Sequence, residues 1–189
     1  MAKKSVIITI YRSELLYDLQ AKTHMLGLGK DDAAAADRVQ STDDEDRLSL
    51  SRRSLNAAIA DMRAAVSEFS PEGPATADNY LPPADGDVVL SLSLPTNYND
   101  GATAGLMAAV HRYVIDRALA EWLTVTDAPS ANAHLAQAEV DMVDVKRLLL
   151  SRKRPERRRC HHHGPKPSTV NYLWLDADVW LDADLWTEQ

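Results

Sequence analysis

Two stretches in the second half of the chain repeat their apolar residues every three or four positions, and this spacing restricts the fold most. The first stretch spans residues 102–126 and the second spans residues 131–149, with a short turn around Pro129 between them. Side chains three and four positions apart share one face of an α-helix. Helices joined by so short a turn lie antiparallel, so the sequence predicts a helical hairpin. Apolar residues cover most of the circumference of the first helix, so we expect this helix to lie at the centre of the bundle.

The first part of the chain predicts two further helices. Residues 15–26 show a helical pattern, and we expect Gly27 and Gly29 to end that helix. Residues 48–69 show a second apolar face with helical spacing. Residues 30–41 are rich in alanine and aspartate and fit either a loop or a weak helix.

Helix start signals precede three of these helices. Thr42 and Glu45 have the spacing of a capping box, in which each side chain accepts a hydrogen bond from the other residue's backbone amide. Asn99 and Ser130 are residue types that favour the N-cap position, and we expect them to cap the two helices of the hairpin.

Two short strands complete the predicted core. Residues 6–10 are mostly β-branched, and residues 88–94 alternate apolar and mostly polar side chains up to Pro95. We expect these strands to pair, with a long surface loop over residues 71–87 before the second one. The predicted fold class is therefore mainly α: a small four-helix bundle with two short β-strands and an extended C-terminal arm.

Composition and charge narrow the class of protein. The chain has 189 residues, 45% of them hydrophobic, which suits one domain with appendages. The formal net charge of −7 argues against a protein that binds nucleic acid through its overall charge. No apolar run approaches the roughly 18 residues of a membrane span, and the first one is too short for a signal peptide. We therefore expect a soluble protein that is made and used without export and has no membrane partner.

The chain divides into three parts by composition. We expect residues 1–150 to form the helical core with its short strands. Residues 151–169 lack apolar periodicity and are rich in arginine, proline and histidine, which is typical of a solvated linker. Residues 170–189 are predicted to be an extended docking tail of β type.

The tail contains the repeat WLDADVWLDADLW, whose period is six. Side chains of a strand alternate with period two, so an even period places the three tryptophans on one face and an apolar set on the other. A helix would scatter the tryptophans around its axis. The residues expected to dock the tail on a partner are Trp174, Leu175, Val179, Trp180, Leu181, Leu185 and Trp186.

A lone strand of this kind needs a sheet to join. One alternative is that the tail folds back on the short strands of its own chain. The alternative that we favour is that it crosses the linker and adds to a neighbouring subunit or to a different protein, with main-chain hydrogen bonds for affinity.

The linker carries the second candidate site, a basic run. Its residues are Arg152, Lys153, Arg154, Arg157, Arg158 and Arg159. Such a run can bind the phosphates of nucleic acid in a salt-dependent way, end a helix favourably, or meet an acidic patch on a partner. We weigh a protein-contacting role above direct contact with DNA, because no aromatic residues are interleaved for base stacking.

The sequence contains no motif that indicates an enzyme. It has no phosphate-binding glycine loop, HExxH motif, paired CxxC or nucleophile elbow. Cys160 and residues 161–163 form a Cys-His run, but consecutive positions rarely point at one ion, so we expect no metal site and no cofactor. His24, His111 and His134 fall on separate predicted helices, where we expect surface or buried neutral residues rather than catalysts.

The layout of the hairpin resembles the head-to-tail connector (adaptor) proteins of tailed bacteriophages. There a helix with a segment such as DRALAEWL, residues 116–123 here, turns into a helix that ends in a basic segment and an extended C-terminal tail. The resemblance extends over residues 45–160 and concerns layout. It implies a viral structural protein of the virion neck, assembled in the host cytoplasm as a ring between portal and tail, commonly a dodecamer.

The same resemblance implies the partners: further copies of the chain, the portal protein, and tail or neck proteins, with non-specific contact to packaged DNA in the lumen. The C-terminal tail then inserts into a neighbour, and the basic run contacts portal or DNA. The rival hypothesis is a DNA-binding accessory or regulatory protein that uses the same arginines.

Overall fold

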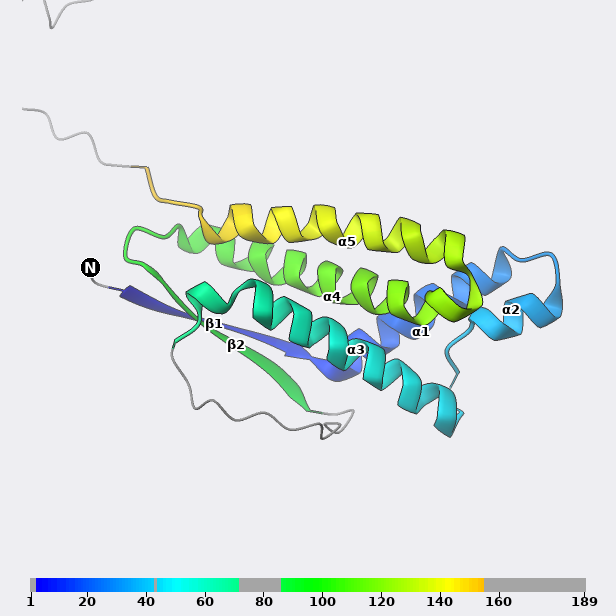
Figure 1. Cartoon of the computed structure of the whole chain (residues 1–189). Helices are drawn as coiled ribbons and strands as arrows, with labels where there is room; N and C mark the ends of the chain where they lie inside the picture. Colours follow the sequence, from blue (N-terminus) through cyan, green and yellow to red (C-terminus); the bar gives the residue numbers. More distant parts are fainter. Residues whose placement is uncertain (1–2, 43, 72–85, 155–189) are drawn as a thin grey trace, which may run out of the picture. The chain divides into compact units, whose positions relative to one another are not determined.

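The computed structural model describes residues 3–42, 44–71 and 86–154 (Figure 1). Most of the predicted surface loop, most of the linker and the whole docking tail lie outside these residues. The elements of the described part are β1 (Lys3–Tyr11), α1 (Arg12–Leu28), α2 (Ala33–Val39), α3 (Glu45–Ala65), η1 (Ser67–Phe69), β2 (Asp87–Pro95), η2 (Asp100–Ala102), α4 (Thr103–Thr126) and α5 (Ala128–Leu149). The mainly helical fold with two antiparallel strands is thus confirmed.

Helix α4 is the centre of the bundle, as its apolar girth predicts. It forms an antiparallel hairpin with α5 and also packs against α3 and α1 (Figure 1). Leu106, Leu119 and Leu123 of α4 are fully buried. The predicted helical hairpin is confirmed, and it is the most extensive helix–helix contact in the described part of the chain.

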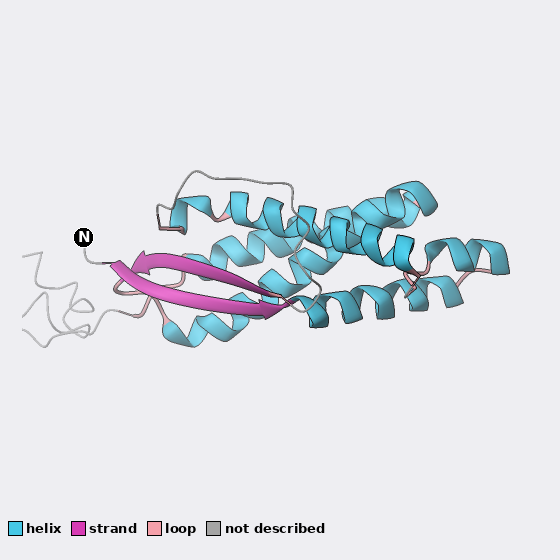
Figure 2. Ribbon diagram, turned by 90° about the horizontal axis from the view of Figure 1, so that it is seen from below, coloured by secondary structure: helices cyan, strands magenta, loops and turns pink. Residues whose placement is uncertain are grey.

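The two strands pair antiparallel along their whole length, with Lys3 opposite Pro95 and Tyr11 opposite Asp87. The alternation of buried and exposed residues turns Val6, Ile8 and Ile10 of β1 toward the helices. Figure 2 shows the resulting layers, with the strand pair lying across one side of the helices. The sheet therefore buries one face and leaves the other face to solvent.

The ambiguous segment 30–41 contains a short helix, α2. Asp32 caps this helix by accepting a hydrogen bond from the amide of Ala34. The buried indole of Trp122 on α4 donates its Nε1–H to the carbonyl oxygen of Val39 at 2.7 Å. This bond ties the end of α2 to the central helix and explains why so weak a helical sequence is ordered.

The predicted capping box is wrong. Helix α3 begins at Glu45, and Asp44 is its N-cap residue, without a capping hydrogen bond from its side chain. The amide of Ser41 donates to the Thr23 hydroxyl at 3.1 Å, and the Ser41 hydroxyl contacts that of Ser51. These buried contacts hold the preceding backbone between α1 and α3, and the N-cap is Asp44, two residues later than the Thr42 cap that the motif suggests.

Two other expected N-caps differ from the structure, whereas the expected end of α1 at Gly29 is confirmed. Asn99 caps the short helix η2 by accepting from the amide of Gly101, and α4 follows directly from η2. Ser130 lies inside the first turn of α5, where its hydroxyl bonds to the carboxylate of Asp127, the N-cap residue. Gly27 lies within the last turn of α1, where its missing side chain admits Gln40, and Gly29 ends the helix.

Candidate functional site

The chain leaves the core beside one end of the strand pair. The backbone amide of Lys153 donates to the carbonyl of Asn97 at 2.8 Å, and Tyr98 and Arg152 form an isolated β-bridge. Asn97 follows the last residue of β2 closely in sequence. The first compact unit of the chain accordingly ends at Lys153, three residues beyond the expected end of the core at residue 150.

Two of the predicted basic contact residues are engaged within the core. The guanidinium of Arg152 donates to the carbonyl oxygens of Leu149 and Ser151, at 3.0 and 3.2 Å. The ammonium group of Lys153 binds a carboxylate oxygen of Asp100 at 2.9 Å. Asp100 also binds Lys4 of β1, and the hydrogen bonds from these two lysines lower the pKa of the Asp100 carboxyl.

Of the remaining basic residues, one belongs to the described part of the chain and three do not. Arg154 is exposed. Arg157, Arg158 and Arg159 lie outside the described residues, as do all seven predicted docking residues of the tail. The structure therefore brings the start of the basic run to the end of the strand pair and leaves the prediction for the rest untested.

The outer face of the strand pair carries exposed apolar residues. Ile7 is 64% exposed, Tyr11 is 56% exposed and Val89 is 48% exposed. In the described part of the chain each strand pairs with the other strand alone, so both outer edges present unpaired backbone groups. A two-stranded sheet with open edges and a half-apolar outer face can accept a further strand.

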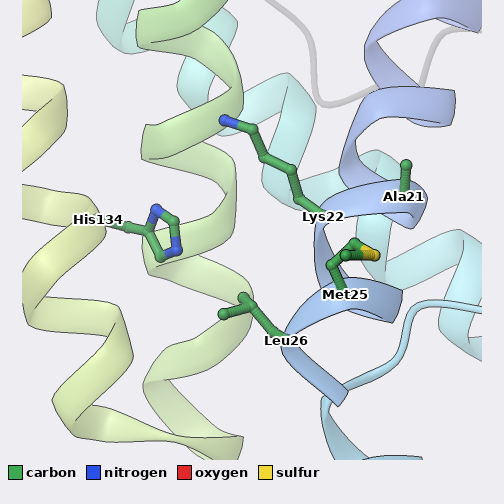
Figure 3. Close-up of a pocket in the computed structure, with 5 residues that line it drawn as sticks. All are labelled: Ala21, Lys22, Met25, Leu26 and His134. Carbon is green, nitrogen blue, oxygen red and sulfur yellow. The ribbon is translucent and has the colours of Figure 1, made fainter. Parts of the chain in front are cut away.

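A groove of about 380 Å³ lies between α1 and α5, over α4. It is lined mainly by apolar atoms of Ala21, Met25 and Leu26, with Lys22 and His134 at its polar side. Figure 3 shows the His134 ring reaching from α5 toward Lys22 and Leu26 of α1. None of these five lining residues is a serine, threonine or cysteine, and the amine of Lys22 is ion-paired with Asp116.

A buried aspartate explains the polar side of this groove. Asp116 of α4 accepts from the Nδ1 atom of His134 at 2.9 Å and from the Lys22 ammonium at 3.2 Å. Burial raises the pKa of the Asp116 carboxyl, but the hydrogen bond from His134 and the charge and hydrogen bond of Lys22 outweigh it, so the pKa is lowered. The trio joins α1, α4 and α5.

The three histidines considered in the sequence thus have different surroundings. His134 is bound to Asp116, and the Nε2 atom of His111 lies 2.8 Å from a carboxylate oxygen of Asp18. His24 is exposed. Two of the three therefore join helices through a hydrogen bond between a ring nitrogen and a carboxylate. The sequence did not predict these contacts.

Replacing Asp116 by asparagine is expected to change how stability depends on pH. Because the folded-state pKa is below the unfolded value of about 3.9, the native carboxylate contributes stability above that pH and loses it as the pH falls through the folded pKa. We expect Asp116→Asn to cost about 1 kcal/mol at pH 7 and to approach the stability of the native chain near pH 2. Urea unfolding across this range measures both quantities.

The matched control for that experiment is Asp18→Asn, which alters the more exposed pair with His111. We expect it to cost less than about 0.5 kcal/mol at pH 7. Equal stability losses at pH 7 and at pH 2 in Asp116→Asn would contradict the role given to the carboxylate charge.

A second apolar stripe runs along the outward side of α5 and was missed in the sequence. Its members are all exposed and recur at alternating steps of three and four: Ala133, Ala136, Val140, Val143, Arg147 and Leu150. We call these six residues the outer stripe; five are apolar. The buried side of α5 carries Ala138, Met142, Val145 and Leu149, whereas Leu135 is 38% exposed. The buried face and the outer stripe together explain the apolar character of this helix.

Other classes of site find no support in the described residues. No group of three or more histidine, cysteine, aspartate or glutamate side chains is placed there to hold a metal ion, and the Cys160–His163 run lies outside them. No helix among residues 3–42, 44–71 and 86–154 has the length and apolarity needed to cross a membrane. Comparison of the chain with family models, curated proteins and solved structures finds no match.

Proposed function

We propose that this chain is a structural assembly protein that docks by its C-terminal tail, and that it serves as a head-to-tail connector of a tailed bacteriophage. The observation that carries the proposal is the position of the chain exit. Lys153 and β1 share Asp100 through Lys4, so the segment that continues into the tail leaves beside an open strand pair. A predicted strand and a sheet that can receive one therefore belong to the same chain.

The dimensions suit strand exchange between copies. Residues 155–169 span at most about 50 Å when fully extended. Strand β1 has nine residues and is about 30 Å long. The predicted strand at residues 170–189 can thus meet a sheet edge of its own chain or of an adjacent copy. Exchange from one copy to the next in a single direction makes a heterologous contact, which closes into a ring when the rotation permits.

The proposed role as a connector also specifies the partners of this assembly. The proposed ring, commonly a dodecamer in such proteins, lies between portal and tail in the virion neck and passes packaged DNA through its lumen. The central α4–α5 hairpin followed by a basic segment supports this assignment, since it is the layout on which the resemblance depends. No catalytic activity belongs to the proposed role.

The rival, a DNA-binding protein, depends on the basic run. Arg152 and Lys153 are bound to backbone carbonyls and to Asp100, respectively, although the Lys153 side chain is exposed, as is that of Arg154. Fewer basic side chains of the run are therefore free to bind phosphates than the sequence suggests. For this reason we favour docking on a protein over binding to DNA.

Mass photometry of the purified chain, alone and with the portal protein of the same virus, tests the proposal. We expect a closed assembly of many copies that gains mass when portal is added. A salt-dependent gel shift on duplex DNA is the matched measurement for the rival. The connector proposal would be overturned if the chain is a monomer that does not bind the portal protein and that binds duplex DNA with nanomolar affinity at physiological salt.

A further inference from the structure

The outer stripe of α5 leaves an apolar face uncovered in the described structure. Val140 is 57% exposed, Val143 is 66% exposed and Leu150 is 57% exposed. Helix α5 packs chiefly on α4, and Figure 1 shows it along the outside of the bundle with its far side open. Isolated exposed valines or leucines are ordinary, but here four apolar residues, Ala133, Ala136, Val140 and Val143, follow one another at steps of three and four, and Leu150 continues the line beyond Arg147.

The spacing identifies the kind of partner. Steps of three and four over residues 133–150 correspond to the a and d positions of a heptad repeat, which pack against another helix. The seam is about 25 Å long. With Ala133, Val140 and Arg147 at position a, the flanking g positions hold Glu139 and Lys146, which are both exposed.

Charge at these flanking positions identifies the partner as a second copy of α5. In an antiparallel pair whose two-fold axis passes between Val140 and Val143, the g positions face each other, so Glu139 of each copy lies opposite Lys146 of the other. A parallel pair would instead place Glu139 opposite Asp144 of the second copy, and like charges repel. The sequence of the stripe is thus self-complementary in the antiparallel orientation alone.

Arg147 is the one charged member of the stripe and fits the same register. In the antiparallel pair it lies opposite Ala136 of the other copy, whose small side chain leaves room for it. Its guanidinium already binds Asp144 of its own helix at 3.0 Å and is largely exposed. A polar residue at one seam position selects a register and reduces affinity.

We infer that two copies of this chain associate through their α5 helices, antiparallel about a two-fold axis between Val140 and Val143. The contact is separate from tail docking and does not rest on the proposed connector function. A ring formed by one-directional exchange has no two-fold axis, so this contact would join copies of two such rings, and an assembly that contains both contacts has dihedral symmetry and an even number of copies.

Charge reversal in the full-length chain tests the inference. Trp174, Trp180 and Trp186 are first replaced by alanine so that tail-dependent contacts do not contribute, and sedimentation equilibrium then measures the step from one copy to two. We expect Glu139→Lys and Lys146→Glu each to weaken the dimer by roughly tenfold, because two facing pairs become repulsive. The double variant is expected to recover the native dissociation constant.

Two further variants make the test independent of the charged pairs. Val143→Asp places a charge in the seam and is expected to abolish the dimer, whereas Arg147→Leu is expected to tighten it by at least tenfold. Asp46→Lys at the exposed start of α3 is the control for a charge reversal elsewhere, and we expect no change. A chain that stays a single copy at 100 µM, or a dimer that survives Val143→Asp, would overturn the inference, while the tail proposal would still stand.

Discussion

Leu119→Ala is expected to lower the free energy of unfolding by about 4 kcal/mol. Leu119 is fully buried on α4, the helix that contacts α1, α3 and α5. Removing its side chain leaves a cavity that neighbours on several sides must fill, and a packed interior relaxes only in part. Urea unfolding followed by circular dichroism measures the change.

The control for this prediction is Leu135→Ala on α5, where the leucine is 38% exposed. We expect that substitution to cost less than about 1 kcal/mol. If both substitutions cost the same, α4 is not the central helix on which the other elements depend.

Replacing Trp174, Trp180 and Trp186 by alanine is expected to abolish the many-copy assembly and to leave the stability of the core unchanged. Buried tryptophans at an interface commonly cost 2 kcal/mol or more each, so three of them correspond to an affinity loss of roughly 10⁴-fold. Mass photometry measures the loss of assembly, and the thermal midpoint of unfolding measures the stability of the core.

The matched control replaces Asp176, Asp178 and Asp182 of the same repeat by asparagine, which keeps size and removes charge. We expect assembly to persist, because backbone pairing and apolar contact hold an added strand. Assembly that persists without the tryptophans would mean that the repeat is not the docking element.

Most of the fold could be predicted from periodicity. The α4–α5 hairpin, the helical patterns of α1 and α3 and both strands follow from apolar residues at steps of two, three or four, since these steps decide which side chains share a face. The boundaries were less predictable. Helix α3 has Asp44 rather than Thr42 as its N-cap residue, because Ser41 is held by a hydrogen bond to Thr23, a residue of another helix.

The candidate site was predictable only in outline. The basic run is visible in the sequence, but the contact of Lys153 with Asp100 depends on how η2 and the chain exit meet in space. The outer stripe was overlooked because α5 carries two apolar faces, and a pattern that fits one buried face conceals the other. In the same way, sequence spacing did not reveal Asp116, which joins residues of three helices.

Hydrogen exchange with a tail peptide tests the central claim most directly, because it asks whether the strand pair receives the tail. A synthetic peptide of residues 168–189 is added to a chain that lacks these residues and whose circular dichroism matches that of the full-length protein. We expect slower exchange of backbone amides in β1 or β2 and unchanged exchange in α5. Protection confined to the helices, or no protection at any peptide concentration, would contradict docking of the tail on the open sheet.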